Sequence, residues 1–201
     1  MKIPLFYGTA MLCLFSACQK EMEAVPNPDP PISTPLETEG FTKYTIPKGG
    51  HYCDKSNYTP VELSELRFRV RFDSTAIYQT TTTENQWDIN KLYGFSDNGS
   101  DHHLFSARFG WNWSEGALRL HAYVYNHGVR ESKELCAIPI GKEMECSIKV
   151  AQGAYLFTVG ELTTTMLRQS GAPQAKGYQL YPYFGGDEPA PHDIRIWIRR
   201  M

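Results

Sequence analysis

The sequence predicts an all-β protein, a two-sheet antiparallel β-sandwich of the jelly-roll type, over residues 41–201. Three observations indicate this fold class. Apolar and polar residues alternate with a period of two in several segments, which is typical of strands buried on one face. Short sequences rich in glycine, asparagine and proline separate these segments and predict turns. Many short strands joined by turns favour a sandwich or a jelly roll.

Three segments carry the clearest alternation, 65–73, 117–126 and 192–200. In the first, leucine, phenylalanine and valine alternate with three arginines, and in the last, three isoleucines alternate with charged residues and tryptophan. In the middle segment, leucine, alanine and valine alternate with arginine, histidine and tyrosine. Shorter predicted strands are, in chain order, 41–46, 75–80, 104–113, 131–138, 144–150, 154–160 and 178–184.

Residues 1–17 predict a signal peptide. Lys2 provides a positive start, an apolar run follows, and small residues precede Cys18. The apolar run is shorter than the roughly 20 residues that span a bilayer. The order Leu14-Phe15-Ser16-Ala17-Cys18 resembles the lipobox of bacterial lipoproteins, which implies cleavage before Cys18 and acylation of this cysteine, with palmitate among the acyl chains. An ordinary signal peptide with a chance cysteine is the alternative.

Residues 18–40 are predicted to form the lipid anchor and a linker. Residues 19–23 resemble the acidic signal that directs Bacteroidetes lipoproteins to the outer face of the outer membrane, with a solvated linker as the alternative. Five prolines within 24–40 predict an extended spacer that buries no core. We therefore expect a bacterial outer-membrane protein that faces the exterior and contacts the membrane through lipid.

Charge and cysteine usage limit the partners and the cross-links. The chain has 20 Lys+Arg and 22 Asp+Glu, so its charge balance does not indicate a nucleic-acid partner. Of its five cysteines, Cys53, Cys136 and Cys146 fall in the predicted domain. Cys136 and Cys146 flank a turn and are candidates for a disulfide in an exported protein. Three buried thiols are the alternative.

The segments 106–111, 118–125 and 180–186 look like core strands of concanavalin A-like lectin and glucanase jelly rolls. This resemblance implies two curved antiparallel sheets whose concave face holds a glycan. The superfamily includes lectins, glycoside hydrolases and polysaccharide lyases. We therefore expect a carbohydrate-binding surface protein whose partner is a polysaccharide or glycan. A polysaccharide lyase and a structural or adhesive protein are the alternatives.

The lyase alternative rests on the strand 119–125. Residues two apart on a strand share a face about 6.5 Å from one another, so His121, Tyr123 and Tyr125 are expected to line one groove. A lyase that cleaves a uronic-acid polymer by β-elimination needs a cation for the substrate carboxylate, a base and an acid. His121, Tyr123, Tyr183 and Arg108 are the predicted catalytic residues, and a polar outer face without chemistry is the alternative.

Two short motifs also resemble alginate-lyase-like jelly rolls, which carry a Gln-x-His strand and a Tyr-Phe-Lys-x-Gly strand. Arg119-Leu120-His121 matches the first with arginine in place of glutamine, and Tyr183-Phe184-Gly185-Gly186 matches the second without its lysine. The paired acids of the glucanase branch have no counterpart. Glu143 and Glu145 are interpreted as the solvated start of a strand.

Several residues are predicted to bind the ligand without chemistry. Aromatic rings stack on the C–H faces of sugars, and arginine pairs with carboxylates in two-point contacts. Core packing is the alternative for each tryptophan. The arginine row of 67–71 is either a solvated, ion-paired face or a binding strip for an acidic glycan. The predicted ligand-binding residues are Trp113, Tyr125, Trp197 and Arg119.

No cofactor is predicted, with one candidate exception. The loop after residue 96 offers the oxygen ligands of Asp97, Asn98 and Asp101, which suit calcium, and a plain turn is the alternative. No other metal is expected. His102 and His103 are adjacent, and adjacent residues of a strand point to opposite faces, so they are not expected to chelate one ion.

Overall fold

The computed structural model describes residues 40–201, so the predicted signal peptide, Cys18 and most of the linker lie outside the described residues. The described chain forms two antiparallel sheets of six strands each, which confirms the predicted all-β sandwich. Two short 3-10 helices, η1 (Ser74–Ala76) and η2 (Thr83–Trp87), complete its regular structure. Within residues 40–201, the helices are too short to cross a membrane.

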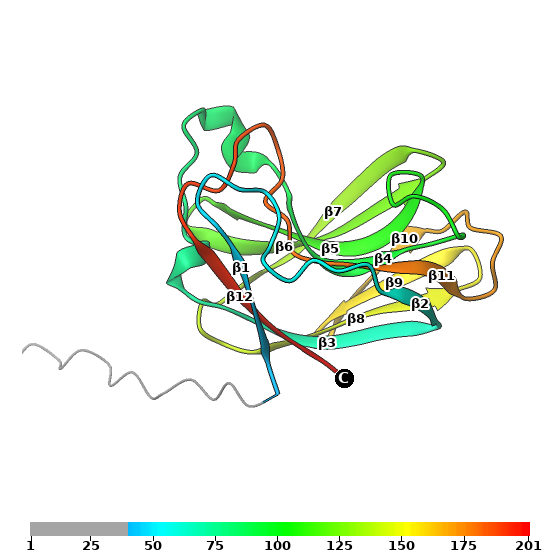
Figure 1. The fold of residues 1–201 in the computed structure, drawn as a ribbon. Helices are drawn as coiled ribbons and strands as arrows, with labels where there is room; N and C mark the ends of the chain where they lie inside the picture. Colours follow the sequence, from blue (N-terminus) through cyan, green and yellow to red (C-terminus); the bar gives the residue numbers. More distant parts are fainter. Residues whose placement is uncertain (1–39) are drawn as a thin grey trace, which may run out of the picture. The chain divides into compact units, whose positions relative to one another are not determined.

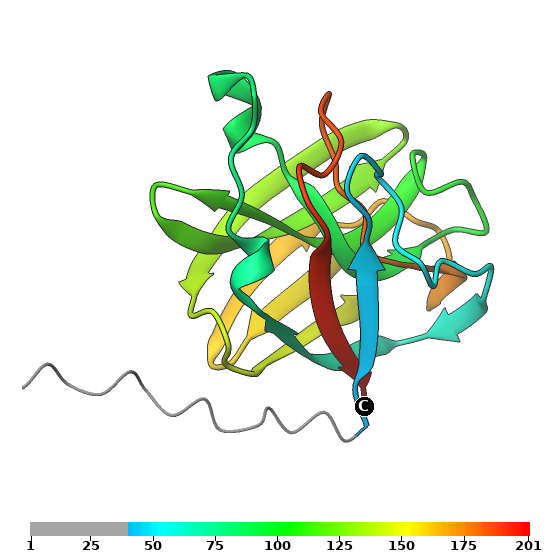
Figure 2. The ribbon, with the colours of Figure 1, turned by 60° about the vertical axis from the view of Figure 1, so that its left-hand side comes forward.

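The two sheets interleave segments that are far apart in the sequence (Figures 1 and 2). The first sheet has the order β1 (Thr42–Ile46), β12 (Ile194–Arg200), β3 (Glu65–Phe72), β8 (Met144–Ala151), β9 (Ala154–Val159) and β10 (Leu162–Leu167). The second has the order β2 (Pro60–Leu63), β11 (Ala175–Leu180), β4 (Asn90–Ser96), β5 (Phe105–Ser114), β6 (Ala117–Asn126) and β7 (Val129–Ile138).

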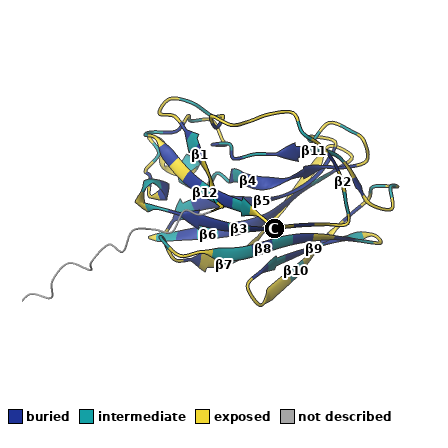
Figure 3. Cartoon of the chain, turned by 60° about the horizontal axis from the view of Figure 1, so that its bottom comes forward, coloured by how far each residue is buried: buried dark blue, intermediate teal, exposed yellow. Residues whose placement is uncertain are grey.

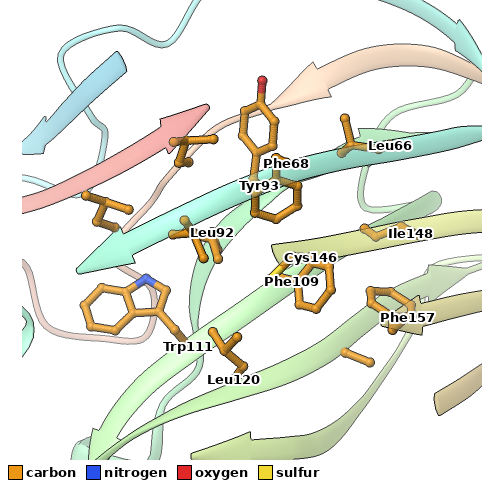
Figure 4. Packing of buried hydrophobic residues seen from close by; sticks show 14 of the residues in the cluster. Leu66, Phe68, Leu92, Tyr93, Phe109, Trp111, Leu120, Cys146, Ile148 and Phe157 are labelled. Atoms are coloured by element: carbon orange, nitrogen blue, oxygen red, sulfur yellow. The ribbon is translucent and has the colours of Figure 1, made fainter. Parts of the chain in front are cut away.

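Alternation along the strands places one face of each sheet in a shared core. The isoleucines of β12 are buried while Arg195 between them is exposed, so the final strand is held between β1 and β3. Aromatic rings join the sheets: Phe68 of β3 meets Phe109 of β5 edge-on at 5.6 Å between ring centroids (Figure 4). Figure 3 shows buried residues along the central strands and exposed residues on edge strand β7.

The strand predicted at 75–80 does not form. Asp73 instead caps η1, because its carboxylate accepts a hydrogen bond from the backbone N–H of Thr75. A side chain that satisfies a free N–H in this way favours a helical turn over an extended strand. Tyr78, in the irregular segment that follows, is still buried and packs edge-on against Trp111.

Strands β2, β4 and β10 were not predicted, and the segment 178–184 is displaced to β11. Strand β4 is buried on both faces except at Lys91, so it lacks alternation. A register shift between Lys91 and Gly94 disturbs its pattern further. Strand β10 consists largely of threonines, and β2 is four residues long and begins with proline. A pattern search needs one apolar and one polar face, which these strands do not show.

A buried ionic network joins the two sheets at the end of β4. Asp97 follows β4 in the second sheet, and its carboxylate accepts hydrogen bonds from the Tyr155 hydroxyl of β9 at 2.6 Å and from Arg168 Nε at 2.8 Å. It also accepts from the backbone N–H groups of Asn98 and Lys176. These partners occupy the carboxylate that the calcium hypothesis required, which argues against a calcium site in this loop.

Two other interpretations are settled by the same structure. Cys53, Cys136 and Cys146 are free thiols, so the proposed disulfide between the last two does not form. Arg67 and Arg69 of the arginine row form ion pairs with Glu145 of the neighbouring strand β8. This row is therefore an ion-paired face of the first sheet, the simpler of the two interpretations.

Candidate functional site

A cavity of about 550 Å³ lies on the face of the second sheet that points away from the core. We call it the tyrosine cavity. Its lining combines tyrosines from both strands and loops with basic side chains. These are Tyr52, Tyr58, Tyr123, Tyr125, Tyr178, Tyr181 and Tyr183, with Lys91, Arg108, Arg130, His102 and His103.

The alternation of side chains along β5 and β6 determines which residues form the centre of the cavity. Arg108 of β5 and Tyr123 of β6 are direct register partners, while their neighbours along each strand are buried in the core. Both side chains therefore point outward from the same position of the sheet. Gly94 of β4 lies opposite Arg108 on the other side, where an added Cβ would approach the Cβ of Arg108 to 2.2 Å. A glycine at this position gives Arg108 its space.

Arg108 forms the floor of the cavity. Its side chain is only 6% exposed, and its guanidinium carbon lies 5.4 Å from the centroid of the Tyr123 ring. Among the described residues, Nε of Arg108 has no hydrogen-bond acceptor. Burial lowers the pKa of Arg108, yet arginine titrates so far above neutrality that it stays charged. A buried guanidinium with an unused N–H is an attractive partner for an anionic ligand oxygen.

Lys91 approaches the same tyrosine. Its Nζ lies 5.0 Å from the Tyr123 ring centroid and donates a hydrogen bond to the Ile89 carbonyl at 2.7 Å. Burial, together with the positive charges of Arg108 and Arg130, lowers the pKa of Lys91 to about 8. Close to neutral pH, this amine is therefore a mixture of charged and neutral forms. Burial raises the pKa of Tyr123 to about 12, so its phenol stays protonated.

Aromatic rings form the walls. On one side, Tyr183 stacks with His51 at 5.5 Å between centroids and meets the exposed Tyr52 edge-on at 4.9 Å. On the other, Tyr178 of β11 packs against the exposed Tyr58 at 5.4 Å. Each wall offers a flat apolar ring with a hydroxyl at its edge, which is the combination that suits a sugar ring.

The structure brings together three of the four predicted catalytic residues. Arg108, Tyr123 and Tyr183 line the tyrosine cavity, whereas His121 does not. His121 is buried two residues along β6 from Tyr123, and its Nε2 lies 3.2 Å from Oδ1 of Asn112. Burial lowers the pKa of His121, so its imidazole is neutral at pH 7.

The predicted binding residues are dispersed. Tyr125 lines the cavity, but Arg119 forms ion pairs with Glu115 and Glu134 at 2.8 Å each. Trp113 is half-buried and packs against the core. Trp197 belongs to the first sheet, on β12, where the guanidinium carbon of Arg71 lies 5.4 Å from its ring. Only Tyr125 of this set therefore contacts the cavity.

Sequence patterns missed several lining residues. Lys91 lies in a strand without alternation, and Tyr52 and Tyr58 lie in the long connection between β1 and β2. Tyr178 falls inside a predicted strand but was not selected. The one available signal was the high tyrosine content, 12 residues in the chain, of which seven line this cavity.

No protein-family model and no curated protein sequence matches the chain. Among solved structures, an alginate lyase superposes with a TM-score of 0.55 at 10% identity, covering 81% of this chain and 74% of the lyase. A family 7 alginate lyase in complex with product gives 0.49 at 10% identity, covering 83% and 82%. An endo-β-1,3(4)-glucanase of family GH16 gives 0.49 at 7% identity, covering 70% and 57%.

The first superposition shows a common fold. The described chain is therefore a two-sheet jelly-roll β-sandwich, the fold class that its alternating strands and turns predicted. At this low identity the likeness extends to the fold alone, so function has to be argued from the residues of the cavity.

Proposed function

We propose that the tyrosine cavity binds a carbohydrate chain that carries negative charges, such as the carboxylates of uronic acids. One observation carries this proposal. Lys91, Arg108 and Arg130 line the cavity together with seven tyrosines, and among the described residues no aspartate or glutamate lines it. Cationic side chains pair with carboxylates, and tyrosine rings stack on sugars.

Size and fold agree with this function. A volume of about 550 Å³ lies within the range of roughly 300–1,000 Å³ that is usual for small-ligand sites. It accommodates a few sugar units, with Tyr52 and Tyr58 exposed at the rim as stacking platforms. The alginate lyase with the same fold supports a carbohydrate ligand by analogy.

Calorimetric titration with matched acidic and neutral oligosaccharides tests the proposal. We expect saturable binding of alginate or polygalacturonate oligomers that weakens as salt is added, because salt screens exposed charges. Neutral laminarin oligomers of the same length should bind at least several-fold more weakly. Equal binding of both classes would refute the charge argument, and the absence of any glycan binding would favour a structural or adhesive surface protein.

Lys91 makes this binding depend on pH. Its amine is charged below pH 8 and loses its proton as the pH rises through its pKa of about 8. Affinity for an acidic oligosaccharide should therefore fall between pH 7 and pH 9, while the charges of Arg108 and of the ligand stay constant. Binding isotherms at several pH values measure this decrease, and Lys91→Gln should flatten the profile. An unchanged slope in Lys91→Gln would contradict the assignment.

A lyase is the second candidate function, and the pKa of Lys91 favours it. An amine with a pKa of about 8 is a suitable base near neutral pH, and it lies next to the cation Arg108 and the protonated phenol of Tyr123. Elimination would remove the proton beside the carboxylate and protonate the leaving oxygen. The ultraviolet absorbance of unsaturated uronate detects this reaction. A rise that is unchanged in Lys91→Gln would exclude this base.

We further propose that the chain is a lipoprotein of the bacterial outer membrane, attached through Cys18 and facing the exterior. The support comes from the lipobox-like order before Cys18 and the proline-rich residues that follow it. Palmitate labelling of cells should mark the wild type and leave Cys18→Ser unlabelled. Labelling of both would disprove this site of attachment.

A further inference from the structure

A turn between β4 and β5 brings three potential metal ligands together. Asp101, His102 and His103 do not continue a strand, because the backbone N–H of Leu104 closes a turn on the Asp101 carbonyl at 2.9 Å. The two imidazole rings lie on the same side, 4.1 Å apart between centroids. The expectation that these histidines point to opposite faces, which assumed a strand, is wrong.

The distances resemble those between ligands of one ion. One ligand atom from each of the three residues lies within 4.8 Å of the others. Oδ2 of Asp101 is 3.7 Å from Nδ1 of His102, and Oδ1 is 3.4 Å from Nδ1 of His103. Two tetrahedral ligands about 2.0–2.1 Å from zinc are about 3.4 Å apart. The carboxylate thus lies between the two imidazoles with little adjustment needed.

Tyr178 adds an orienting contact. Its hydroxyl is 2.8 Å from Nδ1 of His102 and 3.5 Å from Oδ2 of Asp101. A metal ion bound to this nitrogen would replace the hydrogen bond, so the hydroxyl would turn away or itself enter the coordination shell. His103 and Asp101 have side chains that are 65% and 57% exposed, so an ion can enter from solvent.

We propose that Asp101, His102 and His103 bind one divalent transition-metal ion at the rim of the tyrosine cavity. Two imidazoles and one carboxylate suit zinc or its neighbours in the first transition row, whereas calcium prefers oxygen ligands. Three protein ligands leave a coordination position for water or a ligand oxygen. The argument for this site uses none of the three cations, so it does not rest on the proposed glycan binding, although His102, His103 and Tyr178 also line the tyrosine cavity.

Metal titration of the purified, untagged protein tests the site without any glycan. We expect each chain to bind one Co²⁺ ion and to show the visible absorption of a four-coordinate Co²⁺ complex. Added Zn²⁺ should displace the Co²⁺ and remove this absorption. His103→Ala and Asp101→Asn should abolish saturable uptake. His127→Asn is the matched control, because His127 is an exposed loop histidine with φ of 49°, a conformation that asparagine tolerates.

Thermal melts verify that each variant remains folded. Absence of saturable uptake by the wild type would overturn the proposal. Equal uptake by the wild type and by folded His103→Ala and Asp101→Asn would overturn it as well, and so would equal losses in His103→Ala and His127→Asn. Glycan binding, measured separately, has no influence on any of these outcomes.

Discussion

Replacement of Asp97 by alanine is expected to lower the free energy of unfolding by about 3–5 kcal/mol. The Asp97 side chain is fully buried, and Arg168, which pairs with it at 2.8 Å, is nearly so. Removal of the carboxylate leaves the buried guanidinium of Arg168 without its counter-ion and the Tyr155 hydroxyl without its acceptor. The network also links β4 of one sheet to β9 of the other, so its loss weakens the packing of the sandwich. Urea denaturation measures the effect.

Two comparisons separate this explanation from a general loss of charge. Glu145→Ala breaks exposed ion pairs with Arg67 and Arg69 and should destabilise the protein far less than Asp97→Ala does. Asp97→Ala combined with Arg168→Met removes both charges and should recover part of the lost stability, because no buried charge is left unpaired. The control is the change in the free energy of unfolding that Arg168→Met causes in the wild type. If Arg168→Met destabilises the Asp97→Ala variant by the same amount, the two residues do not interact and the network is contradicted.

Replacement of Arg108 by methionine is expected to weaken binding of an acidic oligosaccharide by about 10- to 150-fold, since hydrogen bonds to charged groups contribute about 1.5–3 kcal/mol. The same change should leave the free energy of unfolding equal or raise it. Arg108 is buried beside Tyr123 with an unpartnered Nε, so the folded protein bears the desolvation of this cation without full compensation. Calorimetric titration and urea denaturation give the two values.

The opposite signs of the two effects make this test specific to a binding residue. Arg67→Met, on the exposed face of the first sheet, is the control and should leave affinity unchanged. If Arg108→Met destabilises the fold and binds the oligosaccharide as the wild type does, Arg108 is a structural residue. The proposal for the cavity would then lose its central cation.

The three most clearly predicted strands, β3, β6 and β12, share one property. Each buries an apolar face and carries polar or amphipathic side chains on the other face, so the alternation is visible in the sequence. Strand β4 is central in its sheet and nearly all buried, so it carries no such pattern. Local alternation records the contrast between two faces, and that contrast disappears where both faces are covered.

The same limit applies to the site. Arg108 and Tyr123 were predicted because each occupies the polar face of an alternating strand. Lys91 was missed because its strand does not alternate, and His102 because it lies in a turn, where the rule for strand faces does not hold. His121 was predicted on the correct face of β6, but this residue lies beyond the end of the cavity.

The sequence by itself determined the fold class, the faces of the alternating strands and the outward direction of Arg108 and Tyr123. These properties depend on residues two positions apart in the chain, so a short segment of sequence is enough to predict them. Only the tertiary structure decided that β11 lies between β2 and β4. Because Tyr58 lies just before β2, it therefore meets Tyr178 of β11 across 120 positions of sequence. Strand order depends on the burial of the whole core, a sum over distant contacts that no single segment contains.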